Sequence, residues 1–196
     1  MKGSLLATSL LAAAATVVAA PIAHAAEPKY FFQIKEVTAG PEVDAAVKTQ
    51  AADALKAELA SRPEWASDIH AADPAALAAD LTKRNLRGFE VKVRIESFKQ
   101  EMKDPRPGGR MKQLAVNVKL VIIGATIPDA KMAFEGTGEA GVEAEVAEKR
   151  MAVDSERARK AAIQSAVKQA VEEAVIKLGA KPTPAPTAKK AAKKKT

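Results

Sequence analysis

The segment from Lys131 to Val146 alternates between two kinds of residue along its whole length. Its even positions are apolar residues or glycine, and its odd positions are mostly charged or polar. Alternation with a period of two is typical of a β-strand with one buried face and one solvated face. Segments 89–99 and 114–123 have the same period. The sequence therefore predicts that the middle of the chain forms three strands of one sheet.

The glycines of the first segment also spell the G-x-G-x-x-G pattern of dinucleotide-binding turns, at Gly136, Gly138 and Gly141. That site requires a helix after the glycines and then a second parallel strand. Here the alternation continues through the glycines without a change of phase, and only one helical segment and a polar tail follow. We therefore interpret Gly136 and Gly138 as inward-facing strand residues that another backbone approaches closely, and we expect no cofactor there.

An alanine-rich helix is expected from about Ser155 to Leu178, capped by Asp154 or Ser155 and closed by Gly179. Its small side chains would let it lie close to the glycine strand. The helix is thus the candidate for the backbone that approaches Gly136 and Gly138.

The first part of the domain mixes the two periodicities. Segment 29–37 is expected to be a strand, residues 43–59 an amphipathic helix, and a short helix is expected to start at Asp73-Pro74. Together these elements predict an α+β fold. We expect a two-layer sandwich, with a mainly antiparallel sheet of about four strands and helices on one face.

Residues 1–25 have the pattern of a secretory signal peptide, with Lys2, an apolar run and a final Ala-His-Ala. We expect cleavage after Ala25, with Ala26 as the alternative. The other interpretation, an uncleaved membrane anchor, is disfavoured because the run from Leu5 to Ala20 is short and only weakly apolar. The pattern predicts export to the periplasm or cell envelope, with no transmembrane span once the signal is removed.

Residues 180–196 contain the excess charge of the exported chain. The single domain expected over 26–179 has 24 basic and 24 acidic residues, whereas the tail has six lysines and no acid. Because the tail is rich in proline and has no apolar side chain larger than alanine, we expect it to be disordered. We predict that it binds an anionic envelope polymer or lipid surface, not a specific nucleic acid, or alternatively that it only adds solubility. The lysines are Lys181, Lys189, Lys190, Lys193, Lys194 and Lys195.

The chain offers few groups for catalysis. It has no cysteine, its one histidine after signal removal is His70, and no serine lies in a G-x-S-x-G motif. We therefore expect no catalytic, cofactor or metal site, and no enzyme. The alternative is an exported hydrolase or small-ligand-binding protein that uses the loop from Trp65 to His70. The glutamates at odd positions of 131–146 are interpreted as a solvated face, paired with Lys92, Arg94 and Lys119 on neighbouring strands.

A basic, Pro/Gly-rich connection from Lys99 to Gln113 joins two of the predicted strands. Long connections of this kind often carry binding residues. It is therefore a possible partner-binding loop, with a plain hairpin tip as the alternative. Its basic residues are Lys103, Arg106, Arg110 and Lys112.

The signal peptide, the late G-x-G-x-A strand and the closing segment "DSERARKAAIQSAVKQAVEEAVIKL" resemble a group of small bacterial envelope domains. From about Phe89 to Leu178 the chain is similar to the α+β domain of the curli secretion-channel lipoprotein and to the N-terminal domain of the Tol–Pal translocation protein. The resemblance implies a non-catalytic accessory role in the envelope, with an envelope protein as partner. It departs from those lipoproteins in having no lipobox cysteine, so lipid anchoring is not implied.

Overall fold

A computed structural model describes residues 28–69, 73–103 and 111–179 of the chain. The predicted signal peptide and tail, His70, Arg106 and Arg110 lie outside these ranges. The elements are β1 (Tyr30–Ala39), α1 (Ala45–Ala60), β2 (Trp65–Ala66), α2 (Pro74–Lys83), β3 (Arg87–Lys103), β4 (Met111–Thr126), β5 (Met132–Ala147), a 3₁₀ turn (Glu148–Arg150) and α3 (Met151–Lys177).

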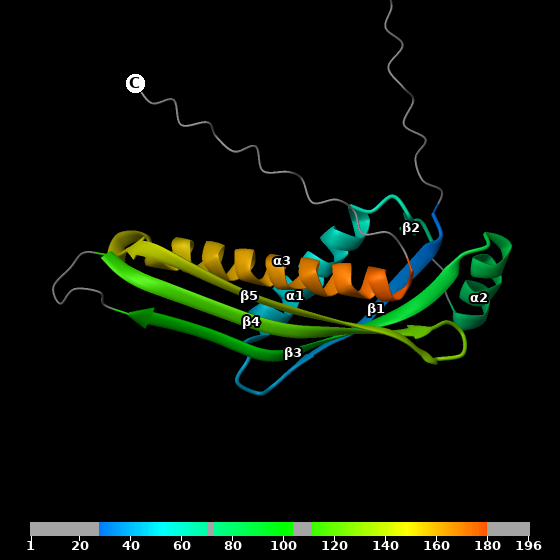
Figure 1. Cartoon of the computed structure of the whole chain (residues 1–196), viewed down its shortest axis with the longest axis horizontal. Coiled ribbons are helices and arrows are strands. Elements are labelled where there is room, and N and C mark those ends of the chain that lie inside the picture. Colours follow the sequence, from blue (N-terminus) through cyan, green and yellow to red (C-terminus); the bar gives the residue numbers. More distant parts are fainter. Residues whose placement is uncertain (1–27, 70–72, 104–110, 180–196) are drawn as a thin grey trace, which may run out of the picture.

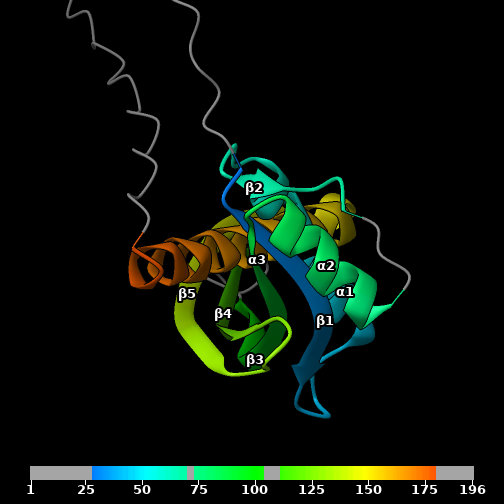
Figure 2. The ribbon, with the colours of Figure 1, turned by 90° about the vertical axis from the view of Figure 1, so that its right-hand side faces the viewer.

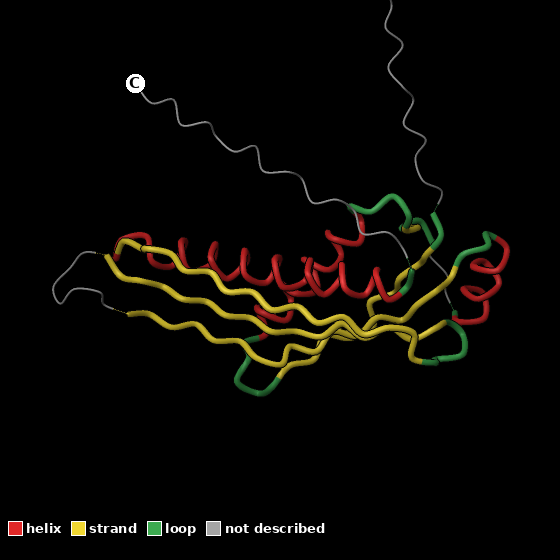
Figure 3. Tube along the Cα trace, viewed as in Figure 1, coloured by secondary structure: helices red, strands yellow, loops and turns green. Residues whose placement is uncertain are grey.

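The five strands form one sheet in the order β2-β1-β3-β4-β5. β3, β4 and β5 are long and antiparallel to their neighbours, and they extend side by side along the molecule (Figures 1 and 3). In this register Leu120 lies opposite Gly138, and Ile122 lies opposite Gly136. The prediction that the middle of the chain forms three strands of one sheet is confirmed.

The other side of the sheet differs from the prediction. β1 is parallel to both β2 and β3, so the sheet is mixed and has five strands. The chain passes through α1 and α2 between β1 and β3, and such a crossover returns it to the end from which β1 started. β2 is only two residues long, too short to produce a periodic signal in the sequence.

The main core lies between the sheet and two helices, α1 and α3. As expected, the alternating apolar residues of the strands are buried; Phe89, Leu120 and Val116 are completely inaccessible. Phe89 stacks on Phe32 with ring centroids 5.4 Å apart and meets the edge of Phe134 at 5.5 Å. This aromatic cluster fills the core where β1 joins the rest of the sheet.

α2 covers the opposite face of the sheet, so the prediction that all helices lie on one face was wrong. A second, smaller core joins Phe31 of β1 to Leu77 and Leu81 of α2, with Ala66 and Ile69 beside them. Because successive strand residues point to opposite faces, Phe31 and Phe32 lie in different cores. Figure 2 shows α2 in front of β1, and Figure 1 shows α2 beyond the right-hand end of α3.

The close approach of α3 to the glycine strand is confirmed. A Cβ atom at Gly138 would overlap the carbonyl oxygen of Ala166, and one at Gly136 would overlap that of Ala170. The predicted end of the helix is also confirmed, because Gly179 has a φ of 79° and its amide donates to the carbonyl of Ile176 at 3.0 Å. The G-x-G pattern therefore allows a helix to pack directly on a strand.

The predicted start of this helix was wrong. α3 begins at Met151, and its N-cap residue, Arg150, makes no side-chain cap hydrogen bond. The 3₁₀ turn after β5 leads directly into the helix, so Asp154 lies in the first turn, where its carboxylate is 3.5 Å from the Arg150 guanidinium. Of the described helices, none is both long and apolar enough to cross a membrane.

Candidate protein-binding groove at the edge of the sheet

The predicted partner-binding loop is described only at its two ends. Lys103 is the last residue of β3, and its ammonium lies 3.9 Å from the Glu101 carboxylate. Lys112 is the second residue of β4. Gln113, the residue after Lys112, lies opposite Lys103 in the register of β3 and β4. The structure thus brings two of the four basic residues to one end of the sheet. A partner-binding role for the loop between them stays a prediction.

The prediction that Lys92, Arg94 and Lys119 pair with the glutamates of 131–146 was wrong for the ion pairs of the described residues. These basic residues contact Glu36 of β1 and Glu96 of β3 instead. The Lys119 ammonium lies 3.0 Å from the Glu96 carboxylate, and Arg94 also contacts Glu96, at 3.2 Å. The hydrogen bond to Glu96 and its charge, with a smaller contribution from Glu139, raise the pKa of Lys119. The same hydrogen bond lowers the pKa of Glu96. These exposed pairs support the interpretation of a solvated face.

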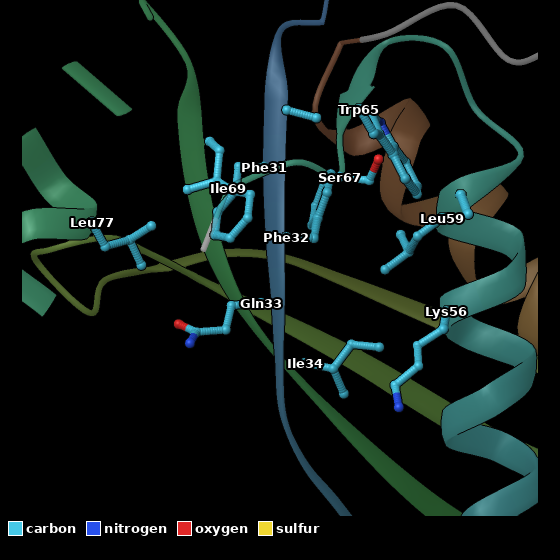
Figure 4. Close-up of a pocket in the computed structure, with 12 residues that line it drawn as sticks. Phe31, Phe32, Gln33, Ile34, Lys56, Leu59, Trp65, Ser67, Ile69 and Leu77 are labelled. Carbon is cyan, nitrogen blue, oxygen red and sulfur yellow. The ribbon is translucent and has the colours of Figure 1, made fainter. Parts of the chain in front are cut away.

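A hollow of about 600 Å³ lies at the other side of the sheet, around β1. Figure 4 shows that β1 runs through its middle, with side chains from α1 on one side and the Leu77 side chain of α2 on the other. We call this hollow the edge groove. Its lining residues are Phe31, Phe32, Gln33, Ile34, Lys56, Leu59, Ala60, Trp65, Ala66, Ser67, Ile69 and Leu77.

The floor of the edge groove is an open strand edge. β2 pairs with β1 only at Tyr30 and Phe31. The Lys29 carbonyl faces β3, where it accepts from the Arg87 amide at 3.0 Å, and the Tyr30 amide faces β2, where it donates to the Glu64 carbonyl at 3.2 Å. Because backbone groups of a parallel strand alternate between its two edges, the groups of the next even-numbered residues also face away from β3.

The open part of this edge runs from Phe32 to the end of β1 at Ala39, and the groove lies along its first residues. Beyond the end of β2, the edge presents the carbonyl of Phe32 and both the N–H and the carbonyl of Ile34 to the groove. In the described part of the chain, no strand pairs with β1 here on the side away from β3. A register shift between Ile34 and Glu36 then bends the strand. The groove therefore offers a small number of backbone groups between two apolar walls.

The outer edge of β5, at the far side of the sheet, is closed by side chains of α3. Glu173 accepts from the Thr137 amide at 2.7 Å, and Gln169 accepts from the Glu139 amide at 2.9 Å. The Lys177 ammonium donates to the Glu135 carbonyl at 2.6 Å. Its hydrogen bond to Glu173, together with that of the Thr137 amide, lowers the pKa of the Glu173 carboxyl. Exposed edges attract foreign strands, and natural proteins commonly cover them.

The Trp65 side chain forms a firmly held wall of the edge groove. Its ring packs on Phe32 with centroids 4.5 Å apart, and the Arg62 guanidinium lies over it at 5.4 Å. Arg62 is itself buried and is fixed by Glu58, 2.9 Å away on the preceding helical turn. The rings of Phe32 and Trp65 are therefore held in place by contacts within the domain.

The described lining of the edge groove is mostly apolar. Lys56 is the one charged side chain in its described lining, and Ser67 and Gln33 are its other polar side chains. Among the described residues, no group of three or more His, Cys, Asp or Glu side chains could hold a metal ion. Sequence reasoning singled out Trp65 but missed Phe32, Ile34 and Lys56. Nothing in their pattern separates them from ordinary core and surface residues.

No family model matches the chain, and no curated protein matches it. Several solved bacterial structures are similar in fold. Protein XCC0632 from Xanthomonas campestris is 10% identical over 79% of this chain and 89% of its own, with a TM-score of 0.48. A minor lipoprotein from Acinetobacter baumannii is 8% identical over 76% and 94%, with a TM-score of 0.38.

Rare lipoprotein B from Shewanella oneidensis is 11% identical over 76% of this chain and 93% of its own, with a TM-score of 0.29. Bacterial lipoproteins are thus among the similar structures. The specific likeness to the curli and Tol–Pal proteins is not shown. Identities and TM-scores this low give the chain no family, and the groove has to be interpreted from its own residues.

Proposed function

We propose that this chain is an exported, non-enzymatic accessory protein of the bacterial cell envelope that binds another protein chain in the edge groove. The observation that carries the proposal is the difference between the two edges of the sheet. Three side chains of α3 cover the β5 edge, whereas the β1 edge is open over an apolar hollow. Adding a strand to an open edge is a common way of binding an extended chain.

The shape of the groove favours a chain over a small ligand. Phe32 and Leu59 line it on one face of β1, and Phe31 and Leu77 line it on the other (Figure 4). An extended chain lying along β1 would place successive side chains on both faces. A hydrolase using the Trp65–His70 loop finds less support, because no carboxylate occurs in the described lining.

We test the groove with single cysteines, which the chain otherwise lacks. Ser67→Cys at the rim, labelled with a photoreactive maleimide, is expected to form a covalent adduct with one envelope protein when illuminated in its own envelope. Ser165→Cys on the exposed side of α3 is the matched control and should form none. Mass spectrometry of the adduct identifies the partner and the peptide that was captured.

A second substitution links the adduct to the strand edge. Ile34→Pro removes the N–H that faces the groove and leaves the ladder to β3 intact, as proline is tolerated where the missing donor faces outward. We expect the Ser67→Cys adduct to disappear in this background while the melting temperature shows that the domain remains folded. An adduct that persists unchanged, or that forms equally from Ser165→Cys, would contradict binding at this edge.

We also propose that the basic tail attaches the domain to an anionic surface of the envelope. The domain itself is neutral, and six lysines follow it without an acid. Lysines near an anionic membrane contribute roughly 1 kcal/mol each, and less as salt increases. We expect full-length protein to sediment with phosphatidylglycerol-containing vesicles at low salt and to be released at high salt. Protein ending at Gly179 should stay in solution; equal or salt-independent sedimentation of both forms would refute the attachment.

A further inference from the structure

We infer that the occupant of the edge groove is an extended acidic peptide segment that pairs with β1 and has an apolar side chain two positions away from a carboxylate. This inference rests on the proposed function and specifies its partner. The apolar side chain would lie against Phe32, Leu59 and Trp65, and the carboxylate would lie against Lys56. The backbone, the apolar contact and the charge each support one part of it.

The backbone part follows from the open edge. The carbonyl of Phe32 and the N–H and carbonyl of Ile34 face the groove, and the described structure provides no strand for them. An extended peptide can satisfy all of these groups at once, as a neighbouring strand does. β2 bounds the groove on one side, and Ile34 is the last residue of β1 that lines it on the other, so only a few residues of the partner can pair inside the groove.

The apolar part is formed on the α1 side of β1. Phe32, Leu59 and Trp65 are partly buried and already packed against the main core. Figure 4 shows the Leu59 side chain and the Trp65 ring on the same side of β1 as Phe32. A Leu or Ile side chain inserted here would cover apolar surface that is now in contact with water, which favours binding.

The charged part is Lys56, which lies beside Ile34 in Figure 4. Lys56 is exposed, and no carboxylate of the described residues forms an ion pair with it. It precedes Leu59 by three residues on α1, so both side chains point to the same side of the helix. Phe32 and Ile34 are likewise two residues apart on one face of β1. A paired peptide therefore places residues i and i+2 opposite Leu59 and Lys56, respectively.

Two other occupants fit less well. A second copy of the domain would bring its own α1 and α2 on the two faces of its β1, and these would meet the walls of the groove. The tail of this chain carries lysines and prolines. Its lysines are repelled by Lys56, and its prolines lack the N–H groups needed for strand pairing. An acidic segment from another envelope protein has neither disadvantage.

The sole tryptophan of the chain, Trp65, makes binding directly measurable by its intrinsic fluorescence. The probe is the peptide acetyl-Thr-Thr-Leu-Thr-Glu-Thr-Thr-amide, tested together with its reversed order because either strand direction is compatible. We expect at least one order to shift and saturate the emission of the full-length protein. Replacing Glu with Lys in that peptide should weaken binding about fivefold, and replacing Leu with Ser should abolish it.

Charge reversal supplies the decisive comparison. Lys56→Glu should exchange the preference, so that the lysine peptide binds better than the glutamate peptide. Lys48→Glu, two turns earlier on the same helix and outside the groove lining, should leave the preference unchanged. No saturable shift with either order, or an identical preference in both variants, would overturn this inference. If the Ser67→Cys adduct still forms in that case, the groove binds a different chain; if the adduct is also absent, the proposed function fails as well.

Discussion

Replacing Gly138 with valine is expected to destabilise the domain by an amount at the upper end of the usual 1–3 kcal/mol for overpacked cores, or about 3 kcal/mol. The glycine lies in β5 directly beneath α3, and the first added carbon would overlap the Ala166 carbonyl oxygen. This atom is main chain and cannot rotate away, so α3 has to move off the sheet. Chemical denaturation followed by circular dichroism measures the loss.

The third glycine of the same pattern is the matched control for this experiment. A Cβ atom at Gly141 would meet the side-chain oxygen of Asn117 at 2.7 Å, and this flexible side chain can turn aside. Gly141→Ala should therefore change the free energy of unfolding little, or raise it slightly, since glycine weakens a strand interior. Equal losses at Gly138 and Gly141, or tight NAD binding in calorimetry, would contradict the packing role of the pattern.

Replacing Phe89 with alanine is expected to destabilise the domain by about 3–5 kcal/mol, the usual range for a fully buried phenylalanine. Phe89 has no accessible surface and contacts the rings of Phe32 and Phe134. The cavity left behind would lie beside Phe32, which lines the edge groove. The variant should therefore lower the melting temperature and also weaken peptide binding.

Phe98 is the control for a generic loss of aromatic surface in the same strand. It is only partly buried and packs at the margin of the main core, so Phe98→Ala should cost clearly less stability. It should leave the fluorescence response of Trp65 to peptide unchanged. A comparable loss of stability in the two variants would mean that the aromatic cluster is not the centre of the core.

The antiparallel half of the fold could be predicted because each of its strands carries its own alternation of apolar and polar residues. Alternation in β3, β4 and β5 requires one buried face, and it continues through Gly136 and Gly138 without a break. The missing side chains at those positions, followed by an alanine-rich helix, also predicted which surfaces meet. Each of these inferences needs only the sequence of one or two segments.

The other half depends on contacts between segments that are distant in sequence. Phe31 and Phe32 are identical residues, and only the position of α2 determines that one lies in each core. β2 exists because the chain after α1 passes beside Tyr30. A strand of two residues is too short to show an alternation of apolar and polar residues in the sequence. The edge groove is missed for the same reason: an open edge is a property of strand order, which no single segment contains.

The capping of β5 by α3 has a consequence for self-association. Gln169, Glu173 and Lys177 follow one another at intervals of four residues, so a single stripe of the helix occupies the place where another strand would add. The covered β5 edge leaves β1 as the edge of this sheet at which a strand could add. Copies of the domain therefore cannot join β1 to β5, which is the head-to-tail pairing that would build a fibre.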